Sequence, residues 1–107
     1  MTSILLEFSM FPTSDDCREG VSVSKQVSKI IDMIDTSGYP YKLTPMGTIV
    51  ETTSIREALD LVEKAYNVLD CERVYSALKF DIRKNSSNRL KTKIDSVKKQ
   101  IGREINT

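Results

Sequence analysis

The chain has 107 residues, a length that suits one domain with a single hydrophobic core. With 39% hydrophobic and 29% charged residues, it has the composition of a folded protein rather than a disordered tail. The formal net charge of +1 gives no reason to expect nucleic acid or an anionic membrane as the default partner. Histidine is absent, which removes the usual general base near neutral pH and the commonest metal ligand. We expect one domain over residues 1–107, without a metal site and without a cofactor.

The cysteines and the N-terminus bear on where the protein resides. Cys17 and Cys71 lie far apart in the sequence and form no CxxC motif. The apolar run at the N-terminus is interrupted by Glu7, too early for a signal peptide, and no stretch approaches the roughly 20 apolar residues of a membrane span. We therefore expect a cytoplasmic protein with two free thiols and no membrane association.

The first two predicted elements are a strand and a helix. Residues 3–11 have the length and composition of a strand, which ends at Pro12. From Val23 to Ile34 apolar residues recur at helical spacing, and Gly38 provides a stop signal. The intervening residues are polar, so we expect a loop between the two elements.

A hairpin and a second helix follow. Residues 39–44 and 48–51 resemble two short strands, joined through Pro45-Met46-Gly47 in a tight turn or bulge. The next apolar face, over residues 54–69, has helical spacing, and Ser54 with Glu57 forms a capping-box pattern at its start.

The last two elements complete a familiar arrangement. Residues 74–83 alternate as a strand does, and residues 90–105 carry one apolar stripe surrounded by basic residues. The first six elements thus have the order β-α-β-β-α-β. This order predicts an α+β, ferredoxin-like fold with a four-stranded antiparallel sheet, two helices on one face and an extra C-terminal helix.

The other face of the sheet is where we expect function. If both helices cover one face, the residues of opposite parity must meet water, another subunit or a ligand. Leu6, Phe8 and Met10 are predicted to face the helices. The residues predicted on the open face are Leu5, Glu7, Ser9, Phe11, Glu51, Lys79, Asp81 and Arg83. This mixture suits a subunit interface around a polar pocket, and it equally suits a solvated face with weak ion pairs.

Two other functions are possible on this topology. From Arg83 onward the chain has eight basic and two acidic side chains, which could bind nucleic acid. The residues 48–51, however, offer no aromatic ring for base stacking, so a solvated helix face is favoured and no nucleic-acid partner is expected. An acyl phosphatase would need an anion-binding loop after the first strand, where this chain has three acidic residues and only Arg18. Because no nucleophile with an adjacent base can be assembled, we expect no enzymatic activity.

Residues 41–51, with the sequence Tyr-Lys-Leu-Thr-Pro-Met-Gly-Thr-Ile-Val-Glu, resemble the signature of the YkoF-like thiamine-binding family. The resemblance also covers Phe11-Pro12, the Val-Ser helix start at residues 21–24, and residues 79–83 ahead of a basic helix. It implies small cytoplasmic ferredoxin-like domains that associate through their sheets into dimers or tetramers. These bind thiamine (vitamin B1) or its hydroxymethylpyrimidine portion without catalysis.

The residue types suit such a ligand. A carboxylate could accept a hydrogen bond from the aminopyrimidine and offset the thiazolium charge, hydroxyls could complete the polar contacts, and a glycine would admit a flat ring. Each residue also has an ordinary structural role to play in a turn, a strand or the core. The predicted ligand-binding residues are Met10, Thr44, Met46, Gly47, Thr48, Ile49, Glu51 and Asp81. We expect a pocket on the open sheet face near a subunit contact; the alternative is an oligomeric interaction module without a small-molecule ligand.

Overall fold

One antiparallel sheet organises the computed structural model, which describes residues 1–18 and 20–107. Within these residues the sheet has four strands in the order β2-β3-β1-β4. The element order confirms the predicted ferredoxin-like α+β fold with a C-terminal helix. The elements are β1 (Thr2–Pro12), a 3-10 helix η1 (Asp15–Cys17), α1 (Ser24–Ser37), β2 (Tyr41–Thr44), β3 (Gly47–Thr52), α2 (Ile55–Leu69), β4 (Val74–Lys84) and α3 (Arg89–Ile101).

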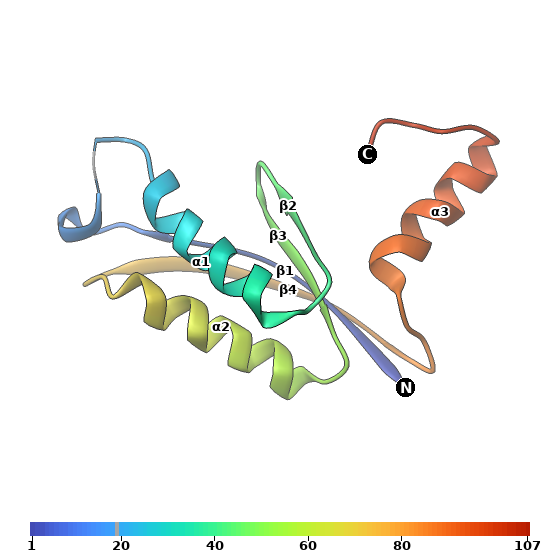
Figure 1. The fold of residues 1–107 in the computed structure, drawn as a ribbon, viewed down its shortest axis with the longest axis horizontal. Helices are drawn as coiled ribbons and strands as arrows, with labels where there is room; N and C mark the ends of the chain where they lie inside the picture. The colour runs from blue at the N-terminus through green and yellow to red at the C-terminus, as the bar shows by residue number, and fades with distance from the viewer. Residues whose placement is uncertain (19) are drawn as a thin grey trace.

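The helices α1 and α2 pack side by side on one face of the sheet, whereas α3 stands apart from them at the other end of the molecule (Figure 1). Between the two helices and the sheet lies the core, to which β1 contributes Ile4, Leu6, Phe8 and Met10. The remaining core residues are Ile30 and Ile34 of α1, Val50 of β3, and Ala58, Leu61, Ala65 and Leu69 of α2. The alternation predicted for β1 is confirmed, because side chains two residues apart share a face.

Local sequence signals set the start of α2 and the end of α1 as predicted, but α3 ends earlier than its apolar pattern predicts. The hydroxyl of Ser54 accepts a hydrogen bond from the backbone N–H of Glu57 at 3.1 Å, which is half of the predicted capping box. Gly38 adopts a left-handed conformation (φ 84°) after α1. Gly102 does the same (φ 85°) after α3 and ends that helix before Ile105, which the sequence pattern includes in it.

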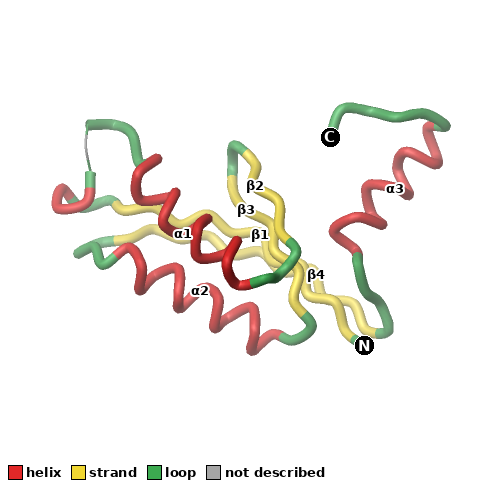
Figure 2. Tube along the Cα trace, in the orientation of Figure 1, coloured by secondary structure: helices red, strands yellow, loops and turns green. Residues whose placement is uncertain are grey.

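The loops of the fold lie at the two ends of the sheet (Figure 2). A disulfide between Cys17 and Cys71, 54 residues apart in the sequence, joins the loop after β1 to the α2–β4 turn, so the expectation of two free thiols is wrong. The same loop is held by hydrogen bonds: Ser14 accepts one from the backbone N–H of Arg73 at 3.0 Å, and Asp16 accepts one from that of Glu72 at 3.0 Å. The sequence spacing does not show that the first loop and the α2–β4 turn meet. Because the two thiols are paired, they no longer support the prediction of a reducing compartment.

The edge strand β4 is exposed on both faces. Leu78, Phe80 and Ile82 lie opposite Phe8, Leu6 and Ile4 of β1, on the side of the helices, as their alternation predicts. They are nevertheless 42%, 37% and 48% exposed, because α2 packs chiefly against β1 and β3.

None of the helices in the described part of the chain is long and apolar enough to cross a membrane.

Candidate functional site

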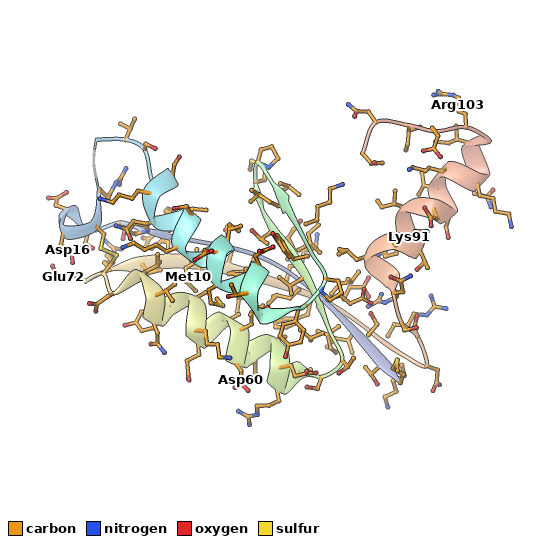
Figure 3. The ribbon with its side chains drawn as sticks, viewed as in Figure 1. Met10, Asp16, Asp60, Glu72, Lys91 and Arg103 are labelled. Atoms are coloured by element: carbon orange, nitrogen blue, oxygen red, sulfur yellow. A yellow bond between two sulfur atoms is a disulfide. The ribbon has the colours of Figure 1, made fainter. Side chains whose placement is uncertain are left out.

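A cavity of about 350 Å³ lies between α1, the end of β1 and the β2–β3 hairpin. Most of its lining is apolar. Five of the predicted ligand-binding residues line it: Met10, Thr44, Met46, Gly47 and Thr48. Figure 3 shows Met10 where α1 crosses the sheet. The cavity therefore opens on the helix-covered side of the sheet, not on the open face where the sequence pattern led us to expect it.

The hairpin that forms one wall is fixed by Thr44 and Gly47. The Thr44 hydroxyl donates to the carbonyl of Gly47 at 2.8 Å and accepts from the backbone N–H of Met46 and of Gly47 at 3.3 and 3.2 Å. A Cβ atom on Gly47 would lie 3.0 Å from the carbonyl oxygen of Phe8, so only glycine lets β3 approach β1 this closely. Thr44 is thus committed to the turn, and Met46, 89% exposed, lies at its tip.

Thr48 places a polar group on the wall of the cavity. Its side chain is 5% exposed and lies on the helix side of β3, opposite Phe8. Within residues 1–18 and 20–107, the Thr48 hydroxyl has no hydrogen-bond partner. A hydroxyl on a cavity wall without a protein partner is available to a polar ligand atom.

The opposite wall comes from α1, which the prediction of the site missed. Val23, Val27, Ile30 and Ile31 line the cavity. The sequence does mark these residues as one apolar helix face, but helical spacing cannot distinguish a side chain that fills the core from one that borders a cavity.

Three predicted site residues lie outside this cavity: Ile49, Glu51 and Asp81. Glu51 is 7% exposed and caps the start of α3. Its carboxylate accepts hydrogen bonds from the Ser3 hydroxyl at 2.6 Å and from the backbone N–H groups of Arg89 and Leu90 at 2.9 and 3.1 Å. Burial opposes ionisation of Glu51, but these hydrogen bonds and the charge of Arg89 outweigh it and lower the pKa of the carboxyl.

Asp81 is part of the same cluster. It forms ion pairs with Lys93 at 2.7 Å and with the guanidinium of Arg89 at 2.9 Å. The hydrogen bonds from Lys93 and then Arg89 lower the pKa of Asp81 to about 2. Arg89 is only 4% exposed and also donates to the carbonyls of Ser3 and Asp81. No local sequence pattern singles out Arg89, because its partners come from three distant strands. Glu51 and Asp81 therefore join α3 to the sheet.

A groove continues from the cavity along α1. It lies between α1 and the edge strand β2 and shares Val23, Val27, Ile31 and Leu43 with the cavity. Its charged lining consists of Asp32 and Asp35, next to the Tyr41 ring, whose hydroxyl donates to Asp35 at 2.8 Å. That hydrogen bond, together with burial, raises the pKa of Tyr41.

The structure gives less support to the two other functions considered for this topology, an acyl phosphatase and a nucleic-acid-binding protein. In the first loop Asp15 and Asp16 are exposed, and Asp16 lies beside Glu72 (Figure 3), whereas Glu19 lies outside the described residues. On α3, Lys91, Lys93 and Lys98 are each paired with a carboxylate. In the described ranges, no group of three or more side chains has the composition and proximity of a metal site.

The fold and the hairpin signature are typical of a class of small ferredoxin-like binding proteins. Comparison with known proteins supports membership of this class. The chain matches the Thiamine-binding protein family over residues 6–98 and belongs to that family. It is similar to the UPF0045 protein MJ1052 of Methanocaldococcus jannaschii, with 30% identity over 91% of this chain and 94% of the relative. A UPF0045 protein of Methanothermobacter thermautotrophicus is 29% identical over 75% of this chain and 84% of its own length.

Solved structures confirm the fold. The crystal structure of MJ1052 has a TM-score of 0.75 and 32% identity, covering 91% of this chain and 97% of that one. A Thermotoga maritima protein, whose description proposes a role in thiamine biosynthesis or salvage, has a TM-score of 0.72. The two sequences are 20% identical, and the alignment covers 89% of this chain and 98% of the Thermotoga maritima chain. At this identity the similarity supports the fold alone.

Proposed function

We propose that the protein is a non-catalytic binding protein for thiamine or its hydroxymethylpyrimidine portion. The ligand would bind in the cavity between α1 and the β2–β3 hairpin. The observation that carries the proposal is the placement of the family signature: the hairpin residues line a cavity, and the hydroxyl of Thr48 on its wall lacks a partner among the described residues. The volume of about 350 Å³ lies in the range of roughly 300 to 1,000 Å³ found for small-molecule sites.

Each wall has a role in this proposal. The apolar side chains of α1, with Met10, would cover the faces of a flat ring, since soft thioether and aliphatic groups are usual linings for such ligands. Thr48 would exchange one hydrogen bond with a ring nitrogen or the amino group of the pyrimidine. Gly47 would keep the hairpin close to β1 and so preserve the shape of the cavity.

The test is titration calorimetry of the whole chain with thiamine and, separately, with hydroxymethylpyrimidine. Thr48→Val retains the shape of the side chain and removes only the hydroxyl, so the fold should persist and the affinity should fall by about 2- to 10-fold. Thr92→Val, on the exposed surface of α3, is the matched control and should bind as the wild type does. Absence of heat at millimolar ligand, with the protein shown to be folded, contradicts the proposal.

We also propose that two copies of the chain associate through β4. A strand at the edge of a sheet has unpaired backbone groups that can pair with another strand, and β4 is 11 residues long. Leu78, Phe80 and Ile82 of β4 are exposed, and α2 carries further exposed apolar side chains, Ile55, Leu59 and Tyr66. Antiparallel pairing of two β4 strands would bury this surface, and it would leave the cavity accessible because the cavity lies toward β2.

Light scattering after gel filtration tests this second proposal. The wild-type mass should correspond to a dimer or a tetramer. Phe80→Lys should lower the mass by placing a charge in the contact, whereas Val21→Lys, at a loop position that is 94% exposed, should not. A monomeric wild-type protein contradicts it. Oligomers without any response to thiamine or hydroxymethylpyrimidine would favour the alternative, an interaction module without a small-molecule ligand.

A further inference from the structure

The two carboxylates that the sequence suggests for a cationic ligand already have partners. Glu51 accepts hydrogen bonds from Ser3 and from the first turn of α3, and both oxygens of Asp81 are engaged by Lys93 and Arg89. A cation that displaced these partners would separate α3 from the sheet. The positive charge of a thiamine-like ligand therefore requires a different group of the protein.

The groove between α1 and β2 provides such groups. Asp32 and Asp35 are three residues apart on α1 and so lie on one side of the helix. The only hydrogen bond to either carboxylate is the one that Tyr41 donates to Asp35, and neither forms an ion pair with any residue that the structure describes. The groove lining contains no basic side chain.

The position of these residues on α1 strengthens the negative potential. The last turn of a helix carries the negative end of the helix dipole, where basic side chains are favourable and acidic ones are not. Asp35 is in the last turn of α1, Asp32 is one turn earlier, and the last turn contains no basic residue. Within the protein alone this arrangement is unfavourable, and a bound cation would relieve it.

The Tyr41 ring adds a second attraction for a cation. The electron-rich face of an aromatic ring attracts a quaternary nitrogen or a flat, delocalised cation such as thiazolium. Tyr41 lines the groove, and its hydrogen bond to Asp35 holds the ring beside the carboxylates. Through Val23, Val27, Ile31 and Leu43 the groove continues into the cavity proposed for the pyrimidine.

We propose that the groove between α1 and β2 binds the cationic part of the ligand, with Asp32, Asp35 and Tyr41 as its recognition residues. This inference rests on the proposed function and adds to it the residues that distinguish a cationic ligand from a neutral one. A neutral pyrimidine would occupy only the cavity, whereas thiamine would extend from the cavity into the groove.

Calorimetry with two ligands on matched variants tests the assignment. Asp32→Asn combined with Asp35→Asn preserves size and removes both charges, so the affinity for thiamine should fall by roughly 3- to 10-fold. The affinity for neutral hydroxymethylpyrimidine should stay within about twofold of the wild-type value. The salt dependence of thiamine binding should also become weaker in this variant, since screening acts on the lost charges. Asp60→Asn, on α2 and outside the groove (Figure 3), is the control and should change none of these quantities.

The outcomes separate this inference from the function on which it rests. Wild-type affinity for thiamine in the double variant overturns the inference and leaves the proposed function in place. An equal loss for both ligands also overturns it, because the aspartates would then act through the shape of α1. If the folded wild-type protein binds neither ligand, the proposed function fails, and the inference fails with it.

Discussion

Removal of the disulfide between Cys17 and Cys71 should cost the protein a large part of its stability. The bridge closes a loop of 54 residues, and the chain-entropy relation for such a loop gives about 4 kcal/mol of stabilisation at 25 °C. This is comparable to the lower part of the range of roughly 5 to 15 kcal/mol found for the whole stability of small proteins. We expect the change to arise mainly in the unfolded chain, since cross-linking restricts that state most.

The folded loop itself should change little. Ser14 and Asp16 still hold it to the α2–β4 turn through hydrogen bonds to the backbone of Arg73 and Glu72. The Cys17→Ser, Cys71→Ser double variant should therefore retain the native far-ultraviolet circular dichroism spectrum. Its free energy of unfolding should nevertheless be lower.

Urea denaturation of the oxidised protein, the reduced protein and the double variant measures the effect. For slopes of roughly 1 to 3 kcal/mol/M, a loss of about 4 kcal/mol moves the midpoint down by about 1.3 to 4 M. The reduced protein and the double variant should have similar midpoints. A shift below about 0.5 M, with the bridge verified by mass and thiol titration, would refute the reasoning. Two free thiols in the wild-type protein under oxidising conditions would refute the pairing itself.

Three further predictions concern the cluster at the start of α3 and the hairpin. Glu51→Gln should lower the free energy of unfolding by about 2 to 3 kcal/mol, because it weakens the charge-assisted hydrogen bonds from Ser3, Arg89 and Leu90. Urea denaturation measures this change, and Glu63→Gln, at an exposed position, is the control. An unchanged midpoint contradicts the capping role of Glu51. Acid should loosen α3, because the folded-state pKa values of Glu51 and Asp81 are lowered. The stabilisation is complete above their ordinary values of 4.5 and 3.8, and it is lost as the pH falls through the lowered pKa values, that of Asp81 being about 2. As the pH is lowered over this range, the NMR amide resonances of Arg89 and Leu90 should shift before those of the core residues. Simultaneous loss of both sets of resonances argues against a separate loosening of α3. Gly47→Ala should lower stability by about 1 to 2 kcal/mol, because the added methyl group lies 3.0 Å from the carbonyl oxygen of Phe8, and unaltered thermal unfolding would show that the strands adjust freely.

Much of the fold follows from short-range patterns in the sequence. The alternation in β1 predicts the buried side, and the helical spacing, the glycine after α1 and Ser54 with Glu57 predict the helices and their ends. These predictions succeed because the side chains of one element respond to a common periodicity. The C-terminal helix ends earlier than its apolar stripe, since Gly102 stops the backbone whatever the hydrophobic pattern beyond it.

The candidate site could be predicted only in part. The hairpin signature indicated Thr44, Met46, Gly47 and Thr48, and the structure places all four around one cavity together with Met10. It places Glu51 and Asp81 elsewhere, because the buried Arg89 brings them to the start of α3. No local pattern announces that arrangement, which joins β1, β3, β4 and α3.

The amino-acid sequence by itself determined the order of the elements, the inward face of β1 and the family signature of the hairpin. All of these depend on residues close together in the chain. Only the tertiary structure decided that Cys17 meets Cys71, that the cavity lies beneath α1, and that β4 keeps an uncovered apolar side. The physical reason is that such pairings depend on how far each helix extends over the sheet, which is set by packing between distant segments and not by the periodicity of any one of them.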